Sequence, residues 1–492
     1  MTEGSVPNAK PLPMKEFQAK PLFLWYDYFS VPQLEERKSY TTDERDGSQQ
    51  ARAINSIPSY VARCRFFLAL CPVLDCPSEA KVLSAATWSR RGWCRVERAA
   101  RELSRDSSWI LIQSETSMEV VGTAISFGSG CVGEGEFTVP EDRQKLAPVM
   151  RSIVQQKLRH CLQSGDLPAF RSLEIDPIVL LPDSRTDSTT NFLLQNGLKQ
   201  RSRADRAGWS PVHYAALAGD TEVLRNLLDK KAKVNVRTPK DEPALGFPPW
   251  MSALDLALFF KHHEAVRLLL AAKAHVQGGF LTAMNWAAQS DNVEGVRMVC
   301  AAGGSPLAPN LIGTTPIAIA AGMGAQDALD ELVEQGCPDR LQLSQALHAA
   351  AGLRGGSAQM VHHLIGLRAD VDFQWSVPRD LSRVGRLIFK VKSLQHQFGR
   401  PSLFTAFAHH MHSSTALMQA FRTSQHEAAA ALIAAGANLN VRNSRNWIAA
   451  DFAHGGSIPS YVQKGLAGDL SECRRVAYLA LADDRCLVSV SL

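Results

Sequence analysis

One pattern recurs along the second half of the chain and limits its fold more than any other feature. In all but one copy a Ser or Thr precedes a short alanine-rich apolar segment, and a second apolar segment follows after a polar turn. Copies of this unit start at 210, 252, 282, 315, 345 and 415. The spacings of 42, 30, 33, 30 and 70 residues bracket a period of about 33 residues. The last gap therefore holds either two units or one unit plus an insertion.

The residue types in this unit favour a pair of short helices. Ser or Thr caps the first helix, and a proline such as Pro211 fits its first turn, where a missing N–H costs nothing. Paired alanines such as 215–216 let neighbouring helices approach closely, and leucines such as 268–270 fill the layer between units. Glycines such as Gly219 and Gly436 end helices where a positive φ is needed. Stacked helix pairs form a solenoid with an extended concave surface.

The best-preserved copy resembles the ankyrin repeat at nearly every signature position. It reads GWSPVHYAALAGD from 208, VLRNLL from 223 and AKVN from 232. The other copies are similar but degenerate. The resemblance implies an all-α ankyrin solenoid of about seven units over residues 205–453, which binds a protein partner through its concave surface.

An ankyrin solenoid contacts its partner through the tips of its turns and its inner helices. Six residues of the better-defined copies are therefore candidates for partner binding: Asp205, Arg206, Trp209, Tyr214, Asn285 and Trp286. Aromatic side chains serve in cores as well as in interfaces, so a core role for Trp209 and Trp286 stays open.

Residues 373–412 do not fit the repeat and form an insertion. Basic residues dominate it and oppose only Asp380: they are Arg379, Arg383, Arg386, Lys390, Lys392 and Arg400. Apolar residues recur at helical spacing: Leu381, Val384, Leu387, Ile388, Val391, Leu394 and Phe398. This pattern predicts a basic amphipathic helix whose apolar face packs on the solenoid. The alternatives are docking on an acidic membrane surface or in a calmodulin-like groove.

Residues 21–155 alternate predicted strands and helices, which indicates a parallel-sheet α/β domain. The predicted strands are 22–31, 66–70 and 109–112, and the predicted helices are 51–63 and 93–103.

Two motifs of this domain resemble those of known families. Trp25, Asp27 and Gln33 share the register of the W-I-D-A-x-C-I-N-Q segment of fungal heterokaryon-incompatibility (HET) domains, and the segment from Ser89 to Glu97 is similar to the S-x-W-C-x-x-E element of plant-type TIR domains. The resemblance implies a flavodoxin-like TIR/HET-like fold. Only about twenty residues precede the Trp25 strand, where a TIR domain opens with a phosphate-facing strand and loop, so a truncated module stays open. The whole arrangement also resembles uncharacterised ankyrin proteins of algal protists.

In enzymatic TIR domains the glutamate of that element acts in NAD cleavage, and the resemblance carries this role to Glu97 alone. An NAD-cleaving signalling enzyme regulated by the solenoid is therefore the rival hypothesis. The structural alternative is that Trp93 packs in the core, Cys94 is buried and Glu97 pairs with neighbouring arginines.

The remaining segments are expected to be auxiliary. Residues 1–20 are predicted to be a flexible leader, 156–204 capping helices or a degenerate repeat, and 454–492 a C-terminal cap and tail. Adjacent histidines, as in 409–410, point apart on a helix without a Cys or carboxylate partner at ligand spacing, so no metal site is expected. No cofactor is expected either.

Composition narrows the class of function. The net charge of +5 over 492 residues is small, so nucleic acid is not expected as a partner. Ten cysteines without a CxxC pair indicate reduced thiols and a cytoplasmic protein, with the nucleus as the alternative. The sequence therefore predicts a non-enzymatic adaptor or scaffold in intracellular signalling.

Overall fold

A computed structural model describes most of the repeat region and part of the N-terminal module. The described residues are 56–57, 59–76, 81–104, 108–113, 118–121, 132, 135–137, 149–150, 152–158, 160–161, 204, 208–240, 247–353, 355–399, 403–453 and 458–488. The predicted leader, the predicted strand at 22–31 with its HET-like residues, and the candidate contacts Asp205 and Arg206 lie outside them.

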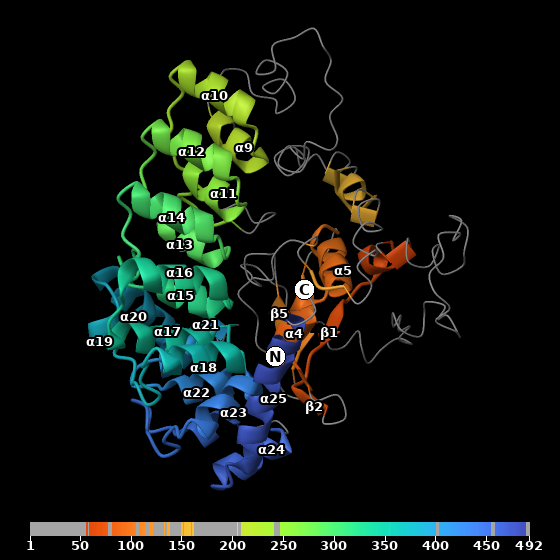
Figure 1. Ribbon diagram of the computed structural model, residues 1–492, viewed down its shortest axis with the longest axis vertical. Helices are drawn as coiled ribbons and strands as arrows, with labels where there is room; N and C mark the ends of the chain where they lie inside the picture. Colours follow the sequence, from red (N-terminus) through yellow and green to blue (C-terminus); the bar gives the residue numbers. More distant parts are fainter. Residues whose placement is uncertain are drawn as a thin grey trace.

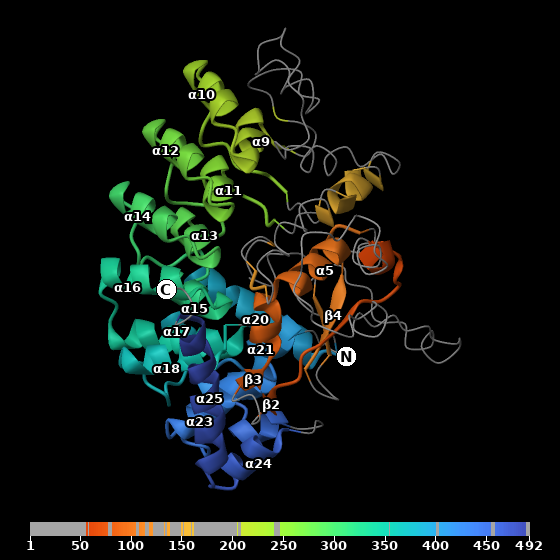
Figure 2. The same cartoon turned by 45° about the vertical axis from the view of Figure 1, so that its right-hand side comes forward.

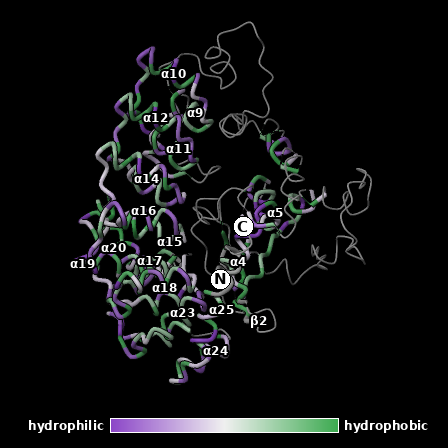
Figure 3. Tube along the Cα trace, in the orientation of Figure 1, coloured by the Kyte–Doolittle hydropathy of each residue, from purple (hydrophilic) through white to green (hydrophobic). Residues whose placement is uncertain are grey.

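Six helix pairs of the described chain stack into a curved column (Figure 1). In chain order they are α9 (Pro211–Ala218) with α10 (Thr221–Asp229), α11 (Ala253–Phe259) with α12 (His263–Ala271), α13 (Ala283–Gln289) with α14 (Val293–Ala301), α15 (Pro316–Met323) with α16 (Gln326–Gly336), α17 (Arg340–Gly352) with α18 (Ala358–Gly366), and α22 (Ala416–Arg422) with α23 (His426–Ala434). Purple hydrophilic and green hydrophobic stretches alternate along these helices in Figure 3, as in helices that bury one side.

The first helices of successive pairs form one continuous layer. Helices α9, α11, α13, α15, α17 and α22 each contact the next in this order. Because α17 contacts α22 directly, the 70-residue gap between repeat starts holds one unit plus an insertion. Alanines such as Ala216, Ala257 and Ala288 are fully buried in this layer, as the paired-alanine pattern predicts.

The predicted starts of the units coincide with helix caps in five of the six pairs. Ser210, Ser252, Thr282, Thr315 and Thr415 are the N-cap residues of α9, α11, α13, α15 and α22. The copy that starts at 345 has no such cap, and its helix begins five residues earlier. Helix α17 begins at Arg340 because Asp339 accepts a hydrogen bond from the backbone N–H of Gln342, whose side chain caps Asp339 in return.

The N-terminal module contains a small mixed sheet. Its strand order is β1 (Leu68–Leu70), β4 (Trp109–Ile112), β5 (Met118–Val121), and α4 (Ala85–Arg90) and α5 (Gly92–Glu102) connect the first two strands. The parallel pairing of β1 with β4 and the helix predicted at 93–103 are confirmed. The sheet is not wholly parallel, however, because β5 pairs antiparallel to β4. Only five residues separate these two strands, and a parallel return needs a crossover of about a dozen or more.

A β-hairpin joins this module to the far end of the solenoid. Strands β2 (Leu74–Cys76) and β3 (Lys81–Leu83) pair antiparallel, and β3 lies against helix α25 (Ser471–Val488). Val73 and Val82 belong to the same buried apolar cluster as the solenoid residues. Figure 2 shows the hairpin beside α25. The module is thus docked on the C-terminal cap, which η4 (Ala449–Ala453), α24 (Ser460–Leu466) and α25 form.

Among the described helices, none combines the length and the apolarity that crossing a bilayer requires.

A buried histidine links α17 to the last complete pair. His348 is 1% exposed, its Nε2 lies 2.9 Å from the Ser414 hydroxyl, and its ring lies against Trp375 with centroids 5.2 Å apart. Burial, followed by the nearby positive charge of Arg422, lowers the pKa of His348 from 6.5 to about 3. The folded chain therefore holds this imidazole neutral.

We expect the free energy of unfolding to fall as the pH is lowered from about 6.5 to 4. The unfolded chain protonates His348 in this window and the folded chain does not, so acid favours unfolding. For this group the loss is about 3 kcal/mol at pH 4. Urea unfolding of His348→Gln between pH 7 and 4 should show a pH dependence reduced by that amount. The exposed His362→Gln variant is the control, and an unchanged pH dependence in His348→Gln would contradict the assignment.

Candidate protein-interaction surface

The insertion between the fifth and sixth pairs is a helical hairpin. It consists of the short α19 (Val377–Asp380), the long α20 (Arg383–Gln397) and α21 (Leu403–His410). Ser382 caps α20, since its hydroxyl accepts a hydrogen bond of 3.0 Å from the backbone N–H of Gly385. Helices α20 and α21 pack against each other. The helix predicted within residues 373–412 is therefore confirmed.

A buried acid anchors the start of this hairpin to the solenoid. The side chain of Asp380 is fully buried and forms an ion pair of 2.6 Å with Arg379. Its carboxylate also accepts hydrogen bonds of 2.6 Å from the backbone N–H of Ser376 and 3.1 Å from the Gln345 side chain on α17. A buried carboxylate is stable only when it is paired and hydrogen-bonded in this way.

The cap of α20 rests on the turn that precedes α15. The backbone N–H of Ser382 donates to the Ile312 carbonyl over 3.1 Å, and its hydroxyl donates to the Leu311 carbonyl over 2.7 Å. Gly385, one turn further, is buried against this turn, and a Cβ at this position would overlap the Ile312 carbonyl oxygen. Close backbone approach, rather than a special φ, explains this glycine.

The inward side of α20 is held by aromatic packing. Phe389 is buried in a small cluster of its own, formed with Trp375, Leu381, Ala408 and Met411. Its ring also meets the rings of Phe404 and Phe407 on α21, with centroids 6.0 and 5.7 Å apart. Gly385 and Phe389 therefore define the side of α20 that faces the protein.

The opposite side of α20 carries an exposed apolar row, which we call the α20 stripe. Its members and their exposed fractions are Val384 (42%), Leu387 (64%), Val391 (45%), Leu394 (42%) and Phe398 (81%). Successive spacings are three, four, three and four residues, so on an ideal helix the row covers an arc of about 80°. Single exposed apolar residues are ordinary on a protein surface, whereas contiguous apolar patches are typical of interaction sites, which makes this row a candidate.

This exposure corrects the expectation that the apolar face packs on the solenoid. Of the seven apolar residues in the predicted stripe, Leu381 is buried and Ile388 is half-buried, but the α20 stripe faces outward. Hydropathy alone gives α20 two apolar sides, and the side with Gly385 and Phe389 is the one that fits against α21 and the turn before α15.

Positive charge borders the α20 stripe. Arg383, Arg386 and Lys390 are exposed on one flank, and the chain has no Asp or Glu between Asp380 and Glu427. In the heptad register that the stripe defines, Arg383 and Lys390 occupy equivalent g positions beside the apolar seam. Such positions select the charge of a helix that packs on the seam.

The described candidate contacts from the repeats lie in the core instead. Trp209, Tyr214, Asn285 and Trp286 are at most 3% exposed. The ring of Trp209 packs on Tyr214 at a centroid distance of 5.4 Å, and Asn285 caps its own helix by accepting from the backbone N–H of Thr282 over 3.1 Å. These side chains stabilise the repeats and do not form a surface. Asn285 and Trp286 follow Thr282 by three and four residues, as His213 and Tyr214 follow Ser210, and this place within the repeat is the sequence signal for their burial.

Glu97 lies half-buried on α5. Its neighbours Cys94 and Arg98 are buried, as the structural alternative predicts for Cys94. Trp93 packs on an apolar cluster that contains Val96 and Ala100.

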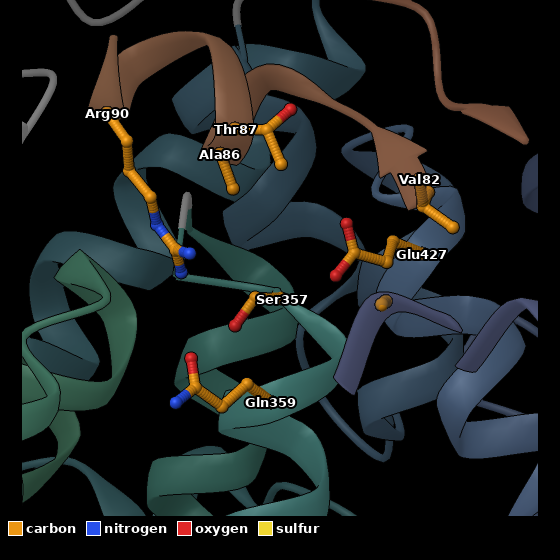
Figure 4. A pocket seen from close by; sticks show the side chains of 8 residues that line it. Val82, Ala86, Thr87, Arg90, Ser357, Gln359 and Glu427 are labelled. Carbon is orange, nitrogen blue, oxygen red and sulfur yellow. The ribbon is translucent and has the colours of Figure 1, made fainter. Parts of the chain in front are cut away.

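A small pocket lies elsewhere, at the junction of the module with the solenoid. Figure 4 shows Arg90 reaching from α4 toward Ser357 and Gln359, with Glu427 on the other side. Glu427 already accepts a 2.7 Å hydrogen bond from the backbone N–H of Ala358, and Glu97 is not among the residues that line the pocket.

Comparison with known proteins identifies the repeat. Residues 207–239, which span α9 and α10, match the family model "Ankyrin repeat". The chain contains an ankyrin repeat. The five pairs that follow share the capped helix-turn-helix design of this unit.

Other similarities extend over more of the chain. The chain is similar to the tyrosine-protein kinase Shark of Drosophila melanogaster, with 29% identity over 176 residues, which are 34% of this chain and 18% of the kinase. The chain thus spans less than a fifth of the length of this relative. A solved structure, the human ASB11 ankyrin repeat domain, aligns with a TM-score of 0.37 and 21% identity over 53% of this chain and 98% of that domain.

We expect Gly385→Ala to destabilise the chain, because the added Cβ meets the Ile312 carbonyl and forces α20 off its seat. Overpacking of this kind costs about 1–3 kcal/mol, which urea unfolding measures. Gly366→Ala is the matched control, since nothing lies within 4 Å of a Cβ at this helical glycine. Equal stability of the two variants would show that α20 does not rest on the turn before α15.

Proposed function

We propose that the chain is a non-catalytic interaction adaptor of intracellular signalling that uses the α20 stripe to bind an acidic amphipathic helix of a partner protein. The ankyrin repeat supports binding of protein partners as the general role. The outward-facing α20 stripe is the observation that carries the specific proposal.

The width of the stripe favours a helix over a membrane as occupant. Helices that lie in a bilayer interface bury a broad apolar face, whereas a row with strict three-four spacing matches the narrow seam between two paired helices. The stripe is two heptads long and ends at Phe398, its most exposed member. A partner helix of about 15 residues covers it.

The positive charge beside the α20 stripe favours a partner helix that carries acidic residues. Arg383 and Lys390 lie beside the seam one heptad apart, so a bound helix is stabilised by Glu or Asp at its facing positions. A second copy of this chain offers no carboxylate there, since α20 contains no acidic residue. In an antiparallel pair of two α20 helices, Lys390 would face Lys390. Charge complementarity therefore favours an acidic helix from another protein.

We expect a designed 15-residue helical peptide with leucines at a and d and glutamates at e and g to bind the full chain. Fluorescence anisotropy should show that Leu387→Ser combined with Leu394→Ser weakens binding at least tenfold, or about 1.4 kcal/mol. Arg383→Glu combined with Lys390→Glu should weaken binding of the acidic peptide and strengthen binding of a peptide with lysines in place of the glutamates. The distant Lys230→Glu should leave the binding of both peptides unchanged.

Three results would overturn this assignment. They are no binding of the acidic peptide, equal binding of the acidic and basic peptides to the wild-type chain, and self-association that the Leu387→Ser and Leu394→Ser changes abolish. Sedimentation with phosphatidylserine vesicles tests the membrane alternative. Vesicle binding that the same two changes remove, without peptide binding, would assign the stripe to a lipid surface.

As an adaptor without catalysis, the chain is expected to release no nicotinamide from NAD, and Glu97→Ala is expected to behave like the wild type. Chromatography of the reaction mixture after prolonged incubation measures this. Release by the wild-type chain that is lost in Glu97→Ala would contradict the adaptor proposal and support the NAD-cleaving alternative.

A further inference from the structure

Three histidines from the two helices of the inserted hairpin converge. His396 lies near the end of α20, and His409 and His410 end α21. One ring nitrogen of each lies within 4.8 Å of those of the other two. The ring centroids are 4.8 Å apart for His396 and His409, and 5.0 Å apart for His409 and His410. The separation of adjacent histidines expected from sequence does not hold at this helix end, and His396 supplies the third ring.

The innermost of these rings has an unsatisfied nitrogen. His410 is 9% exposed and packs on Trp447 and Phe452, with ring centroids 4.5 and 5.1 Å apart. Its buried Nδ1 has no hydrogen-bond partner. A buried nitrogen left in this state is unfavourable, and a ligand at that atom would offset the loss.

Two hydroxyl groups orient the other rings. The Ser393 hydroxyl lies 3.1 Å from Nδ1 of His409, and the Thr405 hydroxyl lies 3.4 Å from Nδ1 of His396. These contacts leave Nε2 of each ring for a further ligand. Histidines that bind metals are typically fixed in this way through their second nitrogen.

We infer that His396, His409 and His410 bind one Zn²⁺ ion through three imidazoles, with the fourth position open to solvent. Neutral imidazole suits borderline cations such as Zn²⁺, Co²⁺ and Ni²⁺, whereas Mg²⁺ and Ca²⁺ need oxygen ligands. At Zn–N distances of about 2.0–2.1 Å, tetrahedral ligand atoms lie about 3.4 Å apart. Side-chain rotation therefore closes the 4.8 Å cluster by about 1.4 Å. The inference rests on this cluster and not on the proposed function.

The charged groups around the cluster are arginines, and their positions decide whether a cation fits. The positive charges of Arg422 and Arg445 both act on the His410 ring. Arg422 is held away by hydrogen bonds to the Gly352 carbonyl and the Gln419 side chain. Arg445 is exposed, and its side chain hydrogen-bonds the His409 carbonyl over 3.4 Å and the Ser393 hydroxyl over 3.5 Å, with Nη2 at 3.5 Å from Nδ1 of His409. These long contacts at the surface break when the metal binds. Removing Arg445 should therefore tighten metal binding.

Calorimetric titration of the metal-free full chain with ZnCl₂ tests this inference. We expect one ion per chain, no comparable binding of MgCl₂, and at least a tenfold loss of affinity in both His396→Gln and His409→Gln. Arg445→Ala should bind Zn²⁺ several-fold more tightly, and His362→Gln, an exposed histidine on α18, should bind like the wild type. Titration with CoCl₂ should give the visible absorption of a tetrahedral site in the wild type and not in His396→Gln.

Absence of saturable Zn²⁺ binding, or binding that His396→Gln and His409→Gln leave unchanged, would overturn the site. Near-ultraviolet circular dichroism of each variant separates loss of ligands from loss of folding. The acidic-peptide titration is run without metal, so its outcome and that of the Zn²⁺ titration are independent.

Discussion

Close approach between helices faced with alanine is the interaction on which the rest of this structure depends. Alanine side chains such as Ala216, Ala257 and Ala288 are small enough to bring successive first helices into direct contact, and they are fully buried there. Larger residues of the second helices, such as Leu224 and Leu269, then close the layer from one side. Because each unit contacts only its neighbours, the column stays continuous only while every pair keeps this spacing.

The same rule explains how the chain accepts a long insertion without breaking the column. The hairpin leaves the stack between α18 and α22 and returns before α22 begins, so α17 and α22 still meet as if the inserted residues were absent. The hairpin is fixed by polar contacts at its start, through Asp380 and Ser382, and by aromatic packing around Phe389. Its outer side is consequently free of any role in the stack, and an apolar row can stand there without loss of repeat packing.

The repeats could be predicted from local sequence signals. The features that could not be predicted depend on contacts between residues far apart in the sequence. A Ser or Thr before an alanine pair predicts where a helix starts, because the N-cap and the small residues that allow close packing both lie within one repeat. Asp339 caps α17 with equal effect but lies outside that signature, so the helix begins five residues before the copy at 345. An aromatic ring suits a core and an interface alike, so residue type alone did not decide the place of Trp209. Trp286, by contrast, stands at the signature position that Tyr214 occupies in the first unit.

In the insertion, too, local sequence does not predict which apolar residues are buried. Leu387 and Phe389 are both apolar, yet one faces solvent and the other α21, and only the fit of Gly385 on the turn before α15 decides between them. Likewise, the nearness of His396 to His409 and His410 arises from the turn between two helices, which no spacing rule on a single helix contains.

The β2–β3 hairpin has a consequence for the order in which the molecule is completed. Val73 and Val82 are buried only when they join the cluster of the solenoid, and β3 lies against α25, about 390 residues later in the sequence. During synthesis the module emerges before the solenoid, yet this part of its surface stays uncovered until α25 has left the ribosome. Solenoid units can fold one after another as they appear, but the junction closes in a single late step that joins the β2–β3 hairpin to the last described helix.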